Sequence, residues 1–203
     1  HGMGSNTYNT RPWHLPEAAH PTNWATREMA RQIKRKDPGR PAFYYISYQF
    51  PHPPLVPLEV FWDMYKDEEM DPPAYGKWNG NNEVLRELTR AEKRYSQRDI
   101  RRAKRAFYAQ CTHIDNQIRI LVGTLRECNL LDDTIIMFTS DHGDMLFDHH
   151  MVAKCSFYEN VACVPMILSG RPVYDRIGEA GVVSERLAGH VDLMPTLLDL
   201  CGI

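Results

Sequence analysis

The chain has 203 residues, which is long enough to bury a hydrophobic core in one or two domains. Hydrophobic residues make up 43% and charged residues 25%, and the net charge of −2 gives no general attraction to nucleic acid or to an anionic membrane. No segment has the continuous apolar length that is needed to span a bilayer. We therefore expect neither nucleic acid nor a membrane among its partners.

The first half of the chain predicts one helix and one strand. Residues 1–20 contain glycine and proline and predict a loop. A helix is expected at residues 23–36, because apolar residues recur there every four positions. Residues 42–48 (AFYYISY) are dense in aromatic and β-branched side chains and predict a buried strand, which ends at Pro51-His52-Pro53-Pro54.

The second half alternates between helix and strand. Residues 66–98 predict a polar surface excursion, and residues 100–125 a long helix, because apolar side chains step by three or four throughout. Buried strands are expected at 134–139 and 164–168, and a final helix at 193–200. This order predicts an α/β fold with a largely parallel sheet flanked by helices.

Polar residues follow one of these strands directly, at the end where parallel α/β sheets bind ligands. Asp141-His142-Gly143 comes after the strand at 134–139. A carboxylate and an imidazole can bind a metal, and the glycine lets backbone approach closely. Two ligands are too few for a complete site. The alternative is an aspartate that accepts loop N–H groups beside a surface histidine.

His52 and Lys154 are candidate anion-binding residues. His52 lies among prolines that restrict its backbone, so its ring could act as a general acid or donate to an anion; a surface turn is the alternative. Lys154 is the single charged residue between 151 and 157 and could bind an oxyanion. An exposed lysine paired with Glu159 or Asp148 is the other interpretation.

Together these segments resemble the sulfatase family of the alkaline-phosphatase-like superfamily. IIMFTSDHGDMLFDHHMVAKCSFYENVACVPMIL is similar to the family's metal and lysine segment, where S-D-H/N-G, a lysine, Y-E and V-P follow a strand in that order. PAFYYISYQFPHPP looks like its strand before a P-H-x-P histidine, and GHVDLMPTLLDLCGI like its H-x-D-L-x-P-T-L-L-D-L-x-G element. The resemblance omits only residues 66–98. It implies a sulfatase-like α/β fold in which residues 1–203 form an incomplete catalytic domain.

The resemblance also implies roles for particular residues. Asp141 and His142 would be ligands of a divalent metal, most commonly calcium, although a histidine ligand also admits magnesium or manganese. Lys154 and His52 would hold sulfate oxygens, and one of them would protonate the leaving alcohol. The start His1-Gly2-Met3-Gly4 matches the end of the family's G-K-W-H-x-G element and would put His1 in the sulfate pocket. An arbitrary start of the chain is the alternative.

The chain departs from the family at the nucleophile. That group is a formylglycine made from the Cys or Ser of a C/S-x-P-x-R motif, and none of the five cysteines begins such a motif. Two further metal-binding aspartates of the family's N-terminal part are also missing from the chain. The sequence therefore predicts the later part of a catalytic domain, without nucleophile and with half a metal site. We expect this chain by itself not to hydrolyse sulfate esters.

Three functions stay open. The first is a sulfatase that acts on a sulfated small molecule or a sulfated glycan. The second is a phosphodiesterase or phosphonate monoester hydrolase of the same superfamily, which can share D-H-G and a following lysine. The third is a non-catalytic binding module that keeps the fold. The resemblance also implies a periplasmic or secreted location, because family members are commonly exported.

Overall fold

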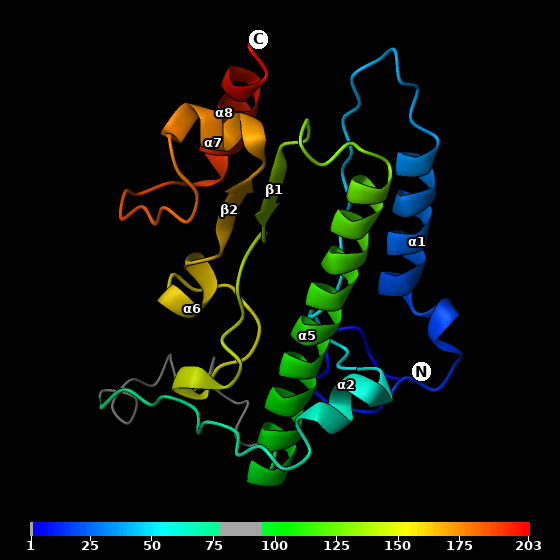
Figure 1. Ribbon diagram of the computed structural model, residues 1–203. Helices are drawn as coiled ribbons and strands as arrows, with labels where there is room; N and C mark the ends of the chain where they lie inside the picture. Colours follow the sequence, from blue (N-terminus) through cyan, green and yellow to red (C-terminus); the bar gives the residue numbers. More distant parts are fainter. Residues whose placement is uncertain (1, 78–94) are drawn as a thin grey trace. The chain divides into compact units, whose positions relative to one another are not determined.

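The computed structural model describes residues 2–77 and 95–203, which are helix-rich (Figure 1). The chain divides into two compact units: the first unit is His1–Thr124 with Asp144–Cys155, and the second unit is Leu125–Gly143 with Ser156–Ile203. In chain order the elements are η1 (Glu17–Ala19), α1 (Pro21–Lys34), α2 (Glu59–Met64), α5 (Gln97–Glu127), β1 (Ile136–Thr139), η2 (Asp148–His150), α6 (Glu159–Ala162), β2 (Met166–Ser169), α7 (Arg171–Ile177), η3 (His190–Asp192) and α8 (Leu193–Leu200).

The long helix predicted at 100–125 is confirmed as α5, of 31 residues. Its start is fixed by a reciprocal cap: Ser96 donates from its N–H and hydroxyl to the Asp99 carboxylate, and the Asp99 N–H donates back to the Ser96 hydroxyl. The apolar stripe packs into a buried cluster with residues from other parts of the first unit. That cluster consists of Tyr8, Leu55, Ile100, Ala103, Ala106 and Phe147.

A pair of buried histidines joins α1 to α5 in the first unit; Figure 1 shows these two helices side by side. His20 caps α1 by accepting the Thr22 N–H at its Nδ1, and it is 0% exposed; His113, on α5, is 1% exposed. Their ring centroids lie 4.8 Å apart, and His113 Nε2 bonds to Asn23 on α1. Burial lowers the pKa of each from 6.5 to about 4, because a charged imidazole loses its hydration there; His20 lowers that of His113 further.

We therefore expect the free energy of unfolding to fall as the pH drops from about 6.5 toward 4. In that range His20 and His113 bind protons in the unfolded chain but not in the folded chain. The stabilising contribution of the two neutral histidines is therefore present above pH 6.5 and is lost as the pH falls below it. Between pH 7 and 5 the loss is roughly 2 kcal/mol for each histidine. Urea unfolding of a His113→Gln variant should show a flatter pH dependence, and the exposed His14→Gln should not. An equal slope in His113→Gln and wild type would contradict this.

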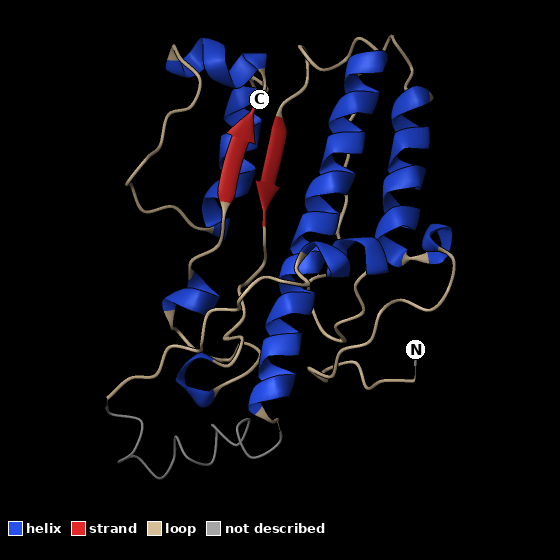
Figure 2. Ribbon diagram, turned by 60° about the horizontal axis from the view of Figure 1, so that its bottom comes forward, coloured by secondary structure: helices blue, strands red, loops and turns tan. Residues whose placement is uncertain are grey.

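The second unit contains the sheet. β1 and β2 pair antiparallel, with Ile136 opposite Ser169 and Thr139 opposite Met166, and Figure 2 shows the two strands side by side. Gly170 makes the tight turn from β2 to α7: its φ is +123°, and a Cβ there would lie 2.2 Å from the Thr134 carbonyl oxygen. The strands expected at 134–139 and 164–168 thus form at nearly the predicted positions, but they are only partly buried, and Ile167 is 54% exposed.

Two expectations about the sheet are not met by residues 2–77 and 95–203. The sheet there has two strands and is antiparallel, so a largely parallel sheet is not shown. The prediction of a buried strand at 42–48 is wrong: Phe43 and Tyr45 are 80% and 78% exposed, and the segment pairs with no described strand. A strand needs a neighbour for its backbone N–H and C=O groups, and composition alone does not supply one.

The surface excursion at 66–98 stays a prediction. Residues 66–77 are largely exposed, and residues 78–94 lie outside the described residues. The helix predicted at 23–36 is confirmed as α1, and the one at 193–200 as α8. Within the described ranges, no helix combines the length and apolarity that crossing a membrane requires.

Candidate active site

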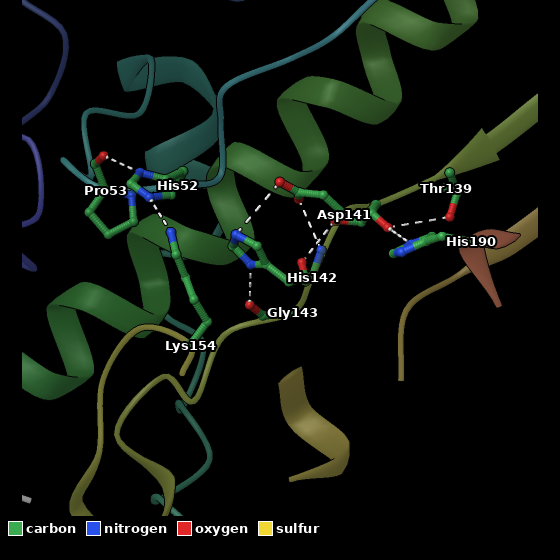
Figure 3. Close-up of polar contacts among 9 residues, drawn as sticks. His52, Pro53, Thr139, Asp141, His142, Gly143, Lys154 and His190 are labelled. Atoms are coloured by element: carbon green, nitrogen blue, oxygen red, sulfur yellow. Dashed lines mark hydrogen bonds and ion pairs between the residues drawn. The ribbon is translucent and has the colours of Figure 1, made fainter. Parts of the chain in front are cut away.

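His52 and Lys154 lie in direct contact in the first unit, although 102 positions separate them in the sequence (Figure 3). Lys154 Nζ is 2.8 Å from His52 Nε2, and His52 Nδ1 is 2.7 Å from the carbonyl oxygen of Pro53. A carbonyl only accepts, so Nδ1 carries the ring proton and Nε2 accepts from the lysine ammonium. In this pair the Lys154 ammonium carries the positive charge, and the neutral His52 imidazole accepts a hydrogen bond from it.

The alternative partner of Lys154 within the first unit is engaged elsewhere. Asp148 lies 4.0 Å from Lys104, a residue of α5, and accepts the N–H of Ala74 at 2.8 Å. Lys154 instead follows a residue, Ala153, whose backbone N–H and C=O are both hydrogen-bonded within the same unit. The lysine is thus presented to His52 by a well-anchored stretch of backbone.

Asp141 and His142 follow β1 in the second unit. His142 Nδ1 lies 2.8 Å from the Gly143 carbonyl oxygen and so carries the proton, while Nε2 lies 3.6 Å from Asp141 Oδ2 (Figure 3). Gly143 is needed for the close approach of two backbone segments: its N–H donates to Val161 at 2.8 Å, and a Cβ would meet the Asn160 carbonyl oxygen at 1.9 Å. The turn after β1 is therefore specific for glycine.

This arrangement fits a divalent metal in part. Donation from Nδ1 to a carbonyl leaves the Nε2 lone pair open, which is how histidine ligands are commonly oriented, and the Asp141 side chain is 85% exposed. Within residues 2–77 and 95–203, no cluster of three or more His, Cys, Asp or Glu side chains could hold a metal ion. The assignment of Asp141 and His142 as metal ligands therefore stays a prediction.

His190 is a residue of the second unit to which the sequence analysis assigned no role. Its Nε2 lies 2.8 Å from the carbonyl oxygen of Ser140, the residue before Asp141, and it donates there because a carbonyl only accepts (Figure 3). Ser140 in turn donates from its hydroxyl to the His142 carbonyl oxygen at 2.9 Å. His190 thus anchors the turn that carries Asp141 and His142. The sequence feature that could have identified His190 is the H-x-D-L element, of which it is the histidine.

One candidate cannot be placed. His1 lies outside the described residues, so its proposed place in an anion pocket stays a prediction. The structure brings His52 together with Lys154, and Asp141 together with His142, each pair within its own unit.

Comparison with known proteins gives strong sequence matches. The family model described as Sulfatase matches residues 3–203. An arylsulfatase of Clostridium perfringens (strain 13 / Type A) is 38% identical over 209 residues, which cover 100% of this chain and 42% of the arylsulfatase. A choline-sulfatase of Rhizobium meliloti (strain 1021) is 32% identical over 170 residues, covering 81% of this chain and 32% of that protein. The chain spans less than half the length of these relatives.

Solved structures share the fold. The phosphonate monoester hydrolase of Agrobacterium radiobacter gives a TM-score of 0.85 at 23% identity, over 99% of this chain and 42% of the hydrolase. A protein solved in complex with its substrate D-glucosamine-2-N,6-O-disulfate gives a TM-score of 0.76 at 20% identity, over 94% of this chain and 50% of that one. At such identities the likeness concerns the fold alone.

Proposed function

Because the chain belongs to the sulfatase family and shares the alkaline-phosphatase-like fold of its structural neighbours, we propose that it forms the later part of the catalytic domain of a sulfuric ester hydrolase. The observation that carries the proposal is the 2.8 Å contact between Lys154 and His52. Cleavage of a sulfate ester moves negative charge onto oxygen, and a fixed ammonium stabilises that charge most where water is excluded.

The two residues of this pair take different roles. Lys154 carries the ammonium protons, so it holds a sulfate oxygen and supplies the proton for the leaving alcohol oxygen. His52 accepts from that ammonium at Nε2 while the Pro53 carbonyl oxygen accepts its Nδ1–H, so the imidazole orients the lysine. His1 is proposed as a further residue of the sulfate pocket in the complete protein.

Asp141 and His142 are proposed as two ligands of a divalent metal, with calcium as the first choice and magnesium or manganese as alternatives. Their open Nε2 and exposed carboxylate support this assignment. When bound, the metal supplies positive charge that stabilises negative charge on the sulfate oxygens. The remaining ligands, and a formylglycine nucleophile, would come from the part of the complete protein that precedes these residues.

The finer description of the fold is also a proposal. We propose that the complete domain contains a larger, mostly parallel sheet, which the order of helices and strands in the sequence predicts. The substrate is proposed to be a sulfated small molecule or a sulfated glycan.

A phosphonate monoester hydrolase of the same superfamily is the second candidate, because such enzymes can share the D-H-G sequence and the following lysine that this chain has at Asp141-His142-Gly143 and Lys154. Both esters place a tetrahedral anion in the site, and Lys154 with His52 could hold either. The geometry of the sulfate or phosphonate oxygens is alike, so the preference between them depends on the complete site.

The test is to assay the complete protein with an aryl sulfate, an aryl phosphonate monoester and a phosphodiester at matched concentrations. We expect kcat/KM for the sulfate ester to exceed the others by at least about 100-fold, because charge and protonation of the site are tuned to one anion. The 203-residue chain should give no turnover. Preference for the phosphonate would favour the second candidate, and sulfate binding without any hydrolysis would favour a binding module.

A further inference from the structure

Tyr8 holds two ends of one loop in the first unit. It is 2% exposed and packs against Phe147, with the ring centroids 5.4 Å apart. Its hydroxyl accepts the N–H of Ala153 at 2.8 Å and bonds to the carboxylate of Asp144. Burial raises the pKa of Tyr8, and Asp144 raises it further, so the hydroxyl stays protonated and donates to the carboxylate. Tyr8 therefore joins the beginning of the loop at residues 144–155 to its end.

The loop cannot hold its shape by local preference. Six of the twelve residues from Asp144 to Cys155 are non-glycine residues with positive φ, a conformation that costs on the order of 1 kcal/mol for each L-residue. Such backbone persists only where surrounding contacts determine it. The residues in this conformation are Leu146, Phe147, His149, His150, Ala153 and Cys155.

Those contacts converge on the residue before Lys154. The Ala153 N–H donates to Tyr8, and its C=O accepts the N–H of Met145 at 2.9 Å. Met145 is 0% exposed, so this second contact is itself held in the core. With both backbone groups of Ala153 fixed, the direction in which Lys154 leaves the loop is fixed as well.

We propose that Tyr8 is the positioning residue for Lys154: its hydroxyl fixes Ala153 so that the lysine ammonium reaches His52. The catalytic consequence of this contact rests on the function proposed above, whereas the positioning itself does not. Tyr8 acts through Ala153 and is not a catalytic residue. It comes from a loop 145 positions away from Ala153 in the sequence.

A matched pair of variants separates positioning from general stability. Tyr8→Phe keeps the buried ring and removes only the hydroxyl. Tyr65→Phe is the control, because the Tyr65 hydroxyl bonds to Thr112 at 2.6 Å in the same unit, and neither residue belongs to the loop at 144–155. Tyr8→Phe removes two hydrogen bonds of its hydroxyl and Tyr65→Phe removes one, each worth about 1 kcal/mol, so the urea midpoint should fall in both variants and further in Tyr8→Phe.

The primary measurement uses the complete protein labelled with ¹⁵N-histidine. In wild type and Tyr65→Phe, the Nε2 resonance of His52 should show a hydrogen-bonded, unprotonated nitrogen that accepts from Lys154. In Tyr8→Phe that resonance should move toward the position of a free imidazole nitrogen. The companion measurement is kcat for the sulfate ester, which we expect to fall about 10-fold or more in Tyr8→Phe and to stay within twofold in Tyr65→Phe.

The outcomes are distinct. A His52 resonance in Tyr8→Phe that matches the control overturns the proposal, whatever the activity. A shifted resonance with unchanged kcat upholds the positioning and contradicts the role of Lys154 in catalysis. If the wild-type protein shows no turnover, the proposed function is contradicted. The His52 resonance alone then decides whether Tyr8 positions Lys154. Should Tyr8→Phe fail to fold, Asp144→Asn weakens the acceptor of the same hydroxyl, and the same resonance is expected to shift in the same direction.

Discussion

Replacing Lys154 with alanine is expected to lower kcat of the complete protein for a sulfate ester by about 100- to 1,000-fold, the loss typical of one oxyanion donor. In the proposed function, the Lys154 ammonium, which lies 2.8 Å from His52, holds a sulfate oxygen and supplies the leaving-group proton, and the alanine variant lacks both. His52→Ala should also lower kcat, and the double variant should lose much less than the product of the two single losses, because each residue acts through the other.

Steady-state kinetics with an aryl sulfate measure this effect. Lys36→Ala is the matched control, since Lys36 belongs to the same unit and its ammonium donates to the carbonyl oxygen of Asp37. Strictly multiplicative losses in the double variant, or a kcat for Lys154→Ala within threefold of wild type, would show that the pair does not work together on the sulfate.

If Asp141 is a metal ligand, as proposed, replacing it with asparagine is expected to weaken the affinity for a divalent metal by more than about 100-fold and to remove most of the activity, because the metal loses a charged ligand. His142→Ala should have a similar effect, since it deletes the open Nε2. Chelation of the wild-type protein should remove activity in parallel with bound metal, and calcium should restore it.

Metal content by mass spectrometry and affinity by titration calorimetry check this expectation. Asp175→Asn is the control: Asp175 is an exposed carboxylate of the second unit whose partner is Arg171. Full metal occupancy in Asp141→Asn, with calorimetry like that of Asp175→Asn, would exclude Asp141 as a ligand.

Patterns among neighbouring residues in the sequence predicted several elements of the fold. The stripe of apolar residues predicted α5 almost to its ends, because the periodicity of a helix depends on residues that are close in the sequence. Strand pairing is not local, which is why residues 42–48 satisfied every compositional sign of a buried strand and yet expose Phe43 and Tyr45. The burial of His113 could not be predicted from the sequence either, because it depends on contacts with α1 and not on the neighbours of His113 along α5.

The residues of the candidate site were likewise predictable only in part. His52 and Lys154 were found through motifs, but their contact joins residues 102 positions apart and follows from the tertiary fold. Tyr8 and His190 were missed because each acts through one hydrogen bond to distant backbone, at separations of 145 and 50 residues. A tyrosine in an N-terminal loop carries no sequence sign of such a role.

The central claim is that Lys154 and His52 together bind a tetrahedral anion in the complete protein. The most direct test is to titrate inorganic sulfate while following the His52 Nε2 resonance, in the wild type and in Lys154→Ala. If the claim holds, sulfate shifts the resonance of the wild type in a saturable way, and Lys154→Ala lowers the sulfate affinity at least about tenfold, because the ammonium that pairs with the anion is gone. A His52 resonance that does not respond to sulfate, or the same sulfate affinity in both proteins, would contradict the claim.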